Sequence, residues 1–176
     1  MLTQLRKLAR AKGGMAAVEF GFVAPVLIVM LFGAIEVTNA LLAKADASNI
    51  ASTAADLVAQ ESTISQANIN DDFTALNALI YPFPSAGSKI IITSIIDDGH
   101  GGGKVGWSVA QNATPHTTGQ AMTVPAGLIT TGGSVIYVEV TYSFTSPLNY
   151  LISSPISMQN NFYAKPRRVS QISYTG

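Results

Sequence analysis

The first third of the chain is a long apolar stretch. Residues 20–35 carry no charge, and apolar residues on both sides extend the run to residues 15–43, interrupted by the acids Glu19 and Glu36. At about 1.5 Å of rise per residue, a helix of this length crosses the ~30 Å hydrocarbon core of a bilayer. The pattern predicts a transmembrane helix over residues 15–43. Pro25 lies within it and is tolerated in a membrane helix, where it can introduce a kink.

The helical pattern continues beyond the apolar run. Polar residues and small apolar residues recur at spacings of three and four on two different faces. The polar set is Asp46, Asn49, Thr53, Asp56 and Gln60, and the apolar set is Ala43, Ala47, Ile50, Ala54 and Leu57. This spacing is typical of an amphipathic helix with a narrow, alanine-rich packing face. We therefore expect one helix of roughly 65–70 Å over residues 15–60, with residues 44–60 continuing the membrane segment. A helix this long in so small a chain points to a role in assembly.

Residues 61–176 predict a small α+β domain with a mainly antiparallel sheet. In chain order, the patterns predict a short helix at 73–80 capped by Asp71 or Asp72, a central strand at 89–96, a hairpin turn at 97–103, a strand around 105–109, a loop at 112–133, a strand at 135–145, a helical turn at 148–152 and a last strand at 156–164. The strand at 135–145 is the clearest, since its apolar and polar residues alternate strictly over most of its length.

The charges are unevenly distributed, although the formal net charge is zero. Four basic residues, Arg6, Lys7, Arg10 and Lys12, precede Gly14, and residues 1–14 contain no acid. By the positive-inside rule, this segment is cytoplasmic and the C-terminal domain lies across the membrane. Nothing in the chain forms the concentrated basic face of a nucleic-acid binder. The absence of cysteine excludes disulfides, thiol chemistry and thiolate metal sites.

Glu19 is the most informative residue of the apolar run. A carboxylate inside a membrane segment is costly and needs a partner. A cut between Gly14 and Met15 would free an amine four residues before Glu19, and this amine could pair with the Glu19 of a neighbouring subunit. Two other readings remain open. The segment could be an uncleaved signal anchor, or a secretory signal peptide cut near Ala43-Lys44-Ala45 or Ala45-Asp46-Ala47.

The start of the apolar run resembles the TadE-like family, the pseudopilins or minor pilins of the tight-adherence (Tad/Flp) type IV pilus system. The resemblance rests on a motif followed by an apolar run that contains Pro25 and a Gly-Ala-Ile-Glu step. The motif is Gly13-Gly14-Met15-Ala16-Ala17-Val18-Glu19-Phe20, and the step is Gly33-Ala34-Ile35-Glu36. The resemblance is specific over residues 6–43 and looser in the C-terminal half, and it does not distinguish the TadE type from the TadF type.

The resemblance implies a pilin-like α+β fold and a role in pilus assembly. The family's processing implies a basic leader at residues 1–14 that a prepilin peptidase removes between Gly14 and Met15, with Glu19 as the assembly acid. The expected partners are the peptidase, other pilin or pseudopilin subunits and inner-membrane lipid. The expected location is the bacterial inner membrane, with a single pass, a periplasmic C-terminal domain and possible incorporation into a surface pilus. The alternative is an uncleaved, signal-anchored periplasmic scaffold or binding module, and a tethered enzyme is the least favoured reading.

Four further residues of the helix have expected roles. Phe20, Pro25 and Gly33 are expected to serve helix packing or kinking. Glu36 either marks the outer membrane boundary, which we favour, or pairs with a partner helix in an assembled shaft.

Other segments offer little chemistry. The stretch from Gly99 to Lys104 lacks the spacing of a phosphate-binding loop, and Asp97, Asp98 and His100 suit a turn better than a metal site. No hydrolase motif surrounds a serine. The basic cluster Lys165-Pro166-Arg167-Arg168 reads as a solvated strand end, although it could also face lipid headgroups or a partner. We therefore expect no enzymatic activity, metal, cofactor, small-molecule substrate or nucleic acid.

Overall fold

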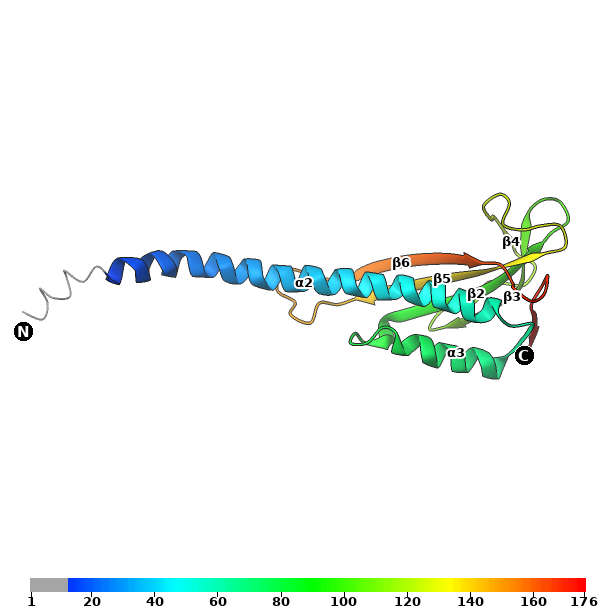
Figure 1. The fold of residues 1–176 in the computed structure, drawn as a ribbon, viewed down its shortest axis with the longest axis horizontal. Coiled ribbons are helices and arrows are strands. Elements are labelled where there is room, and N and C mark those ends of the chain that lie inside the picture. Colours follow the sequence, from blue (N-terminus) through cyan, green and yellow to red (C-terminus); the bar gives the residue numbers. More distant parts are fainter. Residues whose placement is uncertain (1–12) are drawn as a thin grey trace, which may run out of the picture.

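One continuous helix forms the axis of the molecule. The structure is a computed structural model that describes residues 13–176, so the basic residues of the expected leader lie outside the described residues. Helix α2 runs over Gly13–Ala59 and continues without a break past Pro25 (Figure 1). The predicted helix at 15–60 is therefore confirmed, with its membrane-type half and its amphipathic half joined in a single rod.

A five-stranded antiparallel sheet packs beside the second half of α2 (Figure 1). Its strands, in the spatial order β4-β3-β2-β5-β6, are Ala121–Met122, Gly103–Gln111, Ser88–Asp97, Ser134–Phe144 and Ile156–Ala164. The predicted strands at 89–96, 135–145 and 156–164 are confirmed, and so is the central position of the first. The predicted hairpin at 97–103 is confirmed by the antiparallel pairing of β2 with β3. Residues 112–133 contain only β4, as expected for a loop.

The alternation of β5 divides the interior into two clusters. Ile136, Val138 and Val140 are fully buried in the main core, between the sheet and the helices. Tyr142 and Phe144 continue that row. On the opposite face, Val135 and Tyr137 pack with β2 and with the loop after β4 in a smaller cluster. The loop at 112–133 thus covers sheet surface that would otherwise be exposed.

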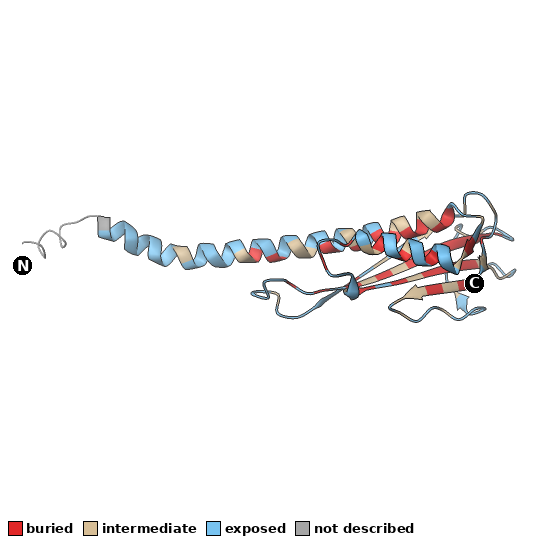
Figure 2. Cartoon of the chain, turned by 90° about the horizontal axis from the view of Figure 1, so that it is seen from below, coloured by how far each residue is buried: buried red, intermediate tan, exposed pale blue. Residues whose placement is uncertain are grey.

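The alanine-rich face of α2 lies against the sheet. Ala43, Ala47, Ile50 and Ala54 are fully buried, and α2 contacts mainly β5 and β6. Small side chains let the helix axis approach the strands closely, because no longer side chain holds them apart. Figure 2 shows burial concentrated on this half of the helix, whereas the N-terminal half is exposed. The sequence pattern thus identified the face that positions the domain.

The short helix begins earlier than predicted. Helix α3 spans Gln66–Ala78, so the predicted range 73–80, with Asp71 or Asp72 as the cap, is wrong. Ser65 caps it in a reciprocal box: the Ser65 Oγ accepts from the Asn68 N–H, and the Asn68 Oδ1 accepts from the Ser65 N–H at 3.2 Å. An asparagine replaces the usual glutamate or glutamine of this box, which is why the sequence pattern did not reveal it.

Three further features were not predicted correctly. Strands β1 (Thr63–Ser65) and β7 (Ser173–Thr175) form a separate parallel pair, and a 3-10 turn, η1, covers Ser85–Gly87. Beside this pair, the Trp107 Nε1–H donates to the Ile172 carbonyl at 2.8 Å. The predicted helical turn at 148–152 is wrong, since this segment is irregular. The N–H groups of residues 150–152 donate to a side chain of α2.

We predict that Ala47→Leu destabilises the domain by about 1–3 kcal/mol, because three added carbon atoms must fit between α2 and the sheet. Ala45→Leu is the matched control, since Ala45 lies on the same helix and is exposed. Urea unfolding of the full chain in detergent, followed by the fluorescence of Trp107, the single tryptophan, measures both. Equal unfolding midpoints for the two variants would contradict the close packing of α2 against the sheet.

Candidate functional site

The residues of the expected cleavage and assembly site lie at the start of α2. Gly14, Met15 and Glu19 are exposed, with Met15 and Glu19 four residues apart and therefore on the same side of the helix. Among the residues that the structure describes, the Glu19 carboxylate accepts no hydrogen bond and forms no ion pair with another residue. Phe20 and Pro25 are also exposed. The first turns of α2 thus present both the proposed cut site and the acid.

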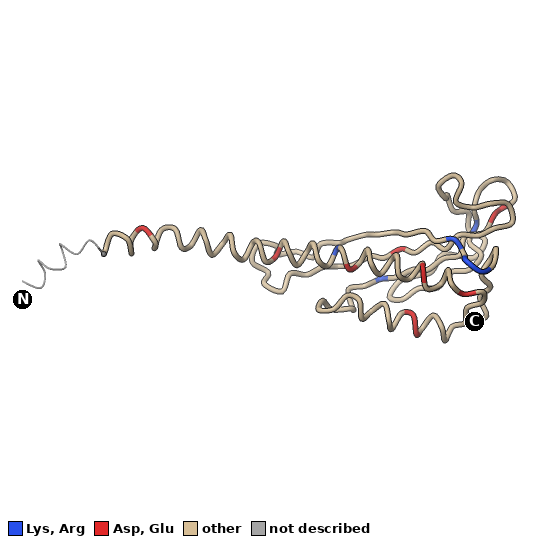
Figure 3. Tube along the Cα trace, viewed as in Figure 1, with Lys and Arg blue, Asp and Glu red and all other residues tan. Residues whose placement is uncertain are grey.

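The N-terminal half of α2 displays apolar side chains on all sides. Fourteen large apolar residues between Met15 and Leu41 are exposed, and the helix is long and apolar enough to cross a membrane. Figure 3 shows an uncharged stretch of helix between the first two acidic positions. A surface this apolar is stable in lipid or against other apolar helices and is unfavourable in water.

Glu36 is fully buried, and its surroundings come from a distant part of the chain. Its Oε1 accepts from the Ser146 hydroxyl and the Tyr150 N–H, both at 2.7 Å. Its Oε2 accepts from the N–H groups of Leu151 at 2.7 Å and Ile152 at 2.8 Å. All four donors lie in the connection between β5 and β6, residues 145–155, which we call the junction loop.

Close packing supports these hydrogen bonds. Gly33 is buried one turn before Glu36, and a Cβ built on it would lie 2.7 Å from the Leu151 Cδ1. The ring centroids of Phe32 and Tyr150 lie 5.7 Å apart. Gly33 therefore lets the junction loop lie close to the helix surface, and any larger residue there would force the Leu151 side chain to shift.

The sequence offered two readings of Glu36 and missed the junction loop. In the structure the acid is satisfied within its own chain, and Gly33 packs against that same loop. One signal was available: Gly33, Glu36, Ala40, Ala43 and Ala47 follow spacings of three and four, so Glu36 lies on the alanine-rich packing face. The position on that face indicates an intrachain contact, but the sequence does not identify the donors.

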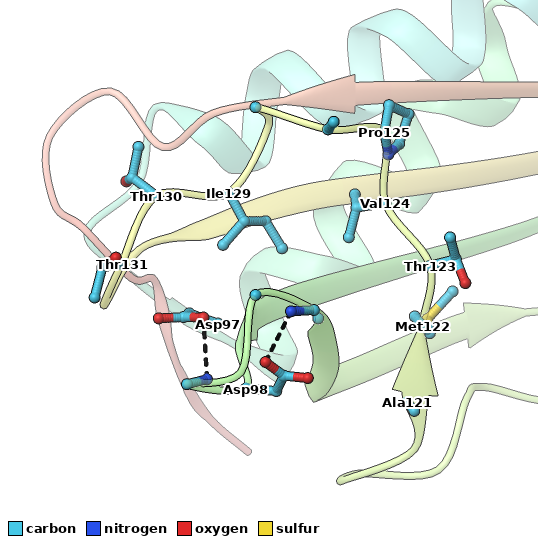
Figure 4. A pocket seen from close by; sticks show the side chains of 16 residues that line it. Asp97, Asp98, Ala121, Met122, Thr123, Val124, Pro125, Ile129, Thr130 and Thr131 are labelled. Atoms are coloured by element: carbon cyan, nitrogen blue, oxygen red, sulfur yellow. Dashed lines mark hydrogen bonds between the residues drawn. The ribbon is translucent and has the colours of Figure 1, made fainter.

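The Asp97-Asp98-His100 segment forms the turn between β2 and β3. Gly99 and Gly101 have φ of 80° and 87°, which favours glycine. Hydrogen bonds from the backbone N–H groups of Gly132 and Gly99 hold the pKa of Asp97 below its usual range, and those of His100 and Gly102 do the same for Asp98. Figure 4 shows both aspartates at the edge of a pocket. The two carboxylates thus accept backbone N–H groups of the turn, and Asp97 accepts one more from Gly132, just before β5.

The remaining candidates lie apart from one another. His116 Nε2 lies 2.6 Å from Glu139 Oε2, and the Tyr137 hydroxyl donates to the other carboxylate oxygen at 3.2 Å. His100 contacts the Asp98 carbonyl instead. In the basic cluster, Arg167 pairs with Asp56 at 2.7 Å and joins the end of β6 to α2, although both side chains are half exposed. Among the described residues, no group of three acids or histidines could hold a metal ion.

Comparison with known proteins identifies the N-terminal segment. Residues 14–56 match the family model described as TadE-like protein, which confirms the resemblance seen in the sequence and links this segment to the Tad pilus system. No curated protein and no solved structure matches the chain. The matched residues include Gly14, Met15 and Glu19 as well as Gly33 and Glu36.

We predict that Glu36→Gln releases the junction loop, because an amide NH₂ would replace one oxygen and face N–H donors. Hydrogen exchange of the full chain in detergent should show faster exchange at Tyr150, Leu151 and Ile152, by about tenfold or more. Ser146→Ala should have a smaller effect, since three backbone donors remain. Asp46→Asn is the control on the same helix. Unchanged exchange in Glu36→Gln would show that the carboxylate does not hold the loop.

Proposed function

We propose that this protein is a pseudopilin or minor pilin of the Tad pilus system, with a structural and not a catalytic role. A prepilin peptidase removes residues 1–14 on the cytoplasmic side, and α2 remains in the inner membrane with the β domain in the periplasm. The match of residues 14–56 to the TadE-like family model supports this assignment, as do the basic residues before Gly14.

The main support for the proposal is the difference in hydrogen bonding between Glu36 and Glu19, the two acids of the apolar helix. Glu36 accepts four hydrogen bonds from its own chain. Glu19 accepts none within the described residues, yet it lies in a segment that lipid would surround. A carboxylate in such a place needs a partner. The amine that cleavage creates on Met15 of a neighbouring subunit has the required charge.

Assembly then follows from the surfaces of α2. The Met15 ammonium of one subunit pairs with Glu19 of the next, so that each charge is neutralised in a medium of low dielectric. The exposed apolar side chains of the helices pack against one another, and the β domains remain outside the bilayer. The alternative is an uncleaved scaffold that anchors the pilus machinery and does not enter the fibre.

Cleavage itself is the first test. Mass spectrometry of the membrane-expressed chain, with and without its prepilin peptidase, should show the loss of residues 1–14 only when the peptidase is present. Gly14→Leu is the control, because a large residue before the cut should block processing. Retention of Met1 with an active peptidase would contradict the proposal and support the scaffold.

We further predict that Glu19→Gln is processed normally but fails to assemble, because the amide cannot neutralise the new amine. The readouts are mass spectrometry for the cut and the amount of this subunit recovered with sheared pili. Glu61→Gln makes the same chemical change at an exposed acid just beyond α2 and should assemble normally. Normal recovery of Glu19→Gln with pili would remove the ion pair from the mechanism.

A further inference from the structure

We propose that the junction loop is a second membrane contact, with its tip in the outer interface of the bilayer and Glu36 supplying the hydrogen-bond acceptors that permit this. The inference rests on the proposed function in one respect, namely that the first half of α2 spans a membrane. It assigns to Glu36 and to residues 145–155 a role in binding lipid.

The depth of the loop follows from the helix. With Met15 at the inner boundary, Gly33 lies about 27 Å along the axis and Glu36 about 32 Å. The hydrocarbon core is about 30 Å thick, so the segment of α2 that holds the junction loop lies at its outer boundary. Tyr150, whose ring lies against Phe32, is therefore at the level where tyrosines concentrate in membrane proteins.

The side chains that the loop exposes suit this position. Leu148, Tyr150 and Leu151 are 42%, 54% and 55% exposed, respectively. Tyr150 and Leu151 lie against Phe32 and Gly33 of α2, next to the exposed apolar surface of that helix. Residues 140–164, which include the whole junction loop and β6, contain no charged residue. Contact with the interface therefore buries apolar area and removes no charge from water.

The N–H groups in the centre of the loop, residues 149–152, also have partners, which suits a site poor in water. An irregular segment is tolerated at membrane depth only where its N–H and C=O groups have partners. The N–H groups of Tyr150, Leu151 and Ile152 donate to Glu36, and that of Asn149 donates to the Ser146 Oγ at 3.3 Å. Pro147 has no N–H group. Glu36 thus satisfies the part of the loop that carries two of its three exposed apolar side chains.

Lipid is the occupant that these observations favour. The surface is continuous with the apolar half of α2, lies at the level of the interface and presents a tyrosine there. The alternative is that a second copy of the chain packs against the junction loop, and the experiment below distinguishes lipid from protein at this surface.

Single-cysteine labelling tests the proposal, since the natural chain has no cysteine. Leu148→Cys, Leu27→Cys and His100→Cys each receive an environment-sensitive fluorophore in the full chain. The proteins are reconstituted in vesicles of phosphatidylethanolamine and phosphatidylglycerol that carry lipid nitroxides near the top or at the end of the acyl chain. His100 is the water control, because it lies at the opposite end of the sheet, where β2 pairs with the start of β5.

We expect the Leu148 probe to emit at shorter wavelength than the His100 probe, with severalfold stronger quenching by the shallow nitroxide. The Leu27 probe should be quenched most by the deep nitroxide. Quenching at Leu27 without quenching at Leu148 would overturn the second contact and leave the membrane helix intact. No quenching at Leu27 would overturn the membrane span, and the inference with it. A blue-shifted Leu148 probe that lipid nitroxides do not quench would place protein over the loop and also overturn the proposal.

Glu36→Gln in the Leu148→Cys chain tests the role of the acid, and Asp46→Asn serves as its control. We expect the shallow nitroxide to quench the Leu148 probe less in Glu36→Gln. In Asp46→Asn, the quenching should stay as it is in the Leu148→Cys chain. If Glu36→Gln alters Trp107 emission, which would indicate unfolding, Ser146→Ala is the milder variant, because it removes one of the four donors to Glu36. Unchanged quenching in both Glu36→Gln and Ser146→Ala would show that the loop reaches the bilayer without the acid.

Discussion

The four hydrogen bonds accepted by Glu36 fix the relation between the apolar rod and the β domain. Their donors come from the connection between β5 and β6, more than one hundred residues along the chain. Because β5 and β6 also carry the sheet surface against which α2 packs, holding their connection at Glu36 sets where on the helix the domain begins. A buried carboxylate without these donors would be strongly destabilising, so the acid and the loop require each other.

From Glu36 onward, the small side chains of α2 make the domain and the helix one body. Ala43, Ala47 and Ala54 are fully buried against the strands, and Arg167 joins the end of β6 to Asp56 near the last turn. The helix is continuous at the point where the domain begins. The domain therefore has a fixed orientation relative to the apolar half of α2, and a neighbouring subunit that contacts that half also positions the domain.

Periodicity was enough to predict the elements that depend on a long repeating pattern. Strands β2 and β5 bury most of their residues, and the second half of α2 buries one face, so each leaves a long repeating pattern in the sequence. Contacts between distant segments leave no such pattern. The pairing of β1 with β7 involves three residues each, and the Ser65 cap uses an asparagine in place of an acid. The hydrogen bonds to Glu36 come mainly from backbone N–H groups, which any residue could supply, so no sequence signal identifies the donors.

The two acids of the apolar helix illustrate why position alone does not assign a role. Both interrupt the same apolar run, and the cost of burying a carboxylate applies to each. Glu36 lies on the face that continues into the buried alanines, where its own chain can supply donors. Glu19 lies almost five turns earlier, beyond the reach of the β domain, and among the described residues it has no hydrogen-bond or ion-pair partner. A helix of this length thus separates an acid that organises the fold from one that the β domain does not contact, and the boundary between them is the point at which the junction loop meets α2.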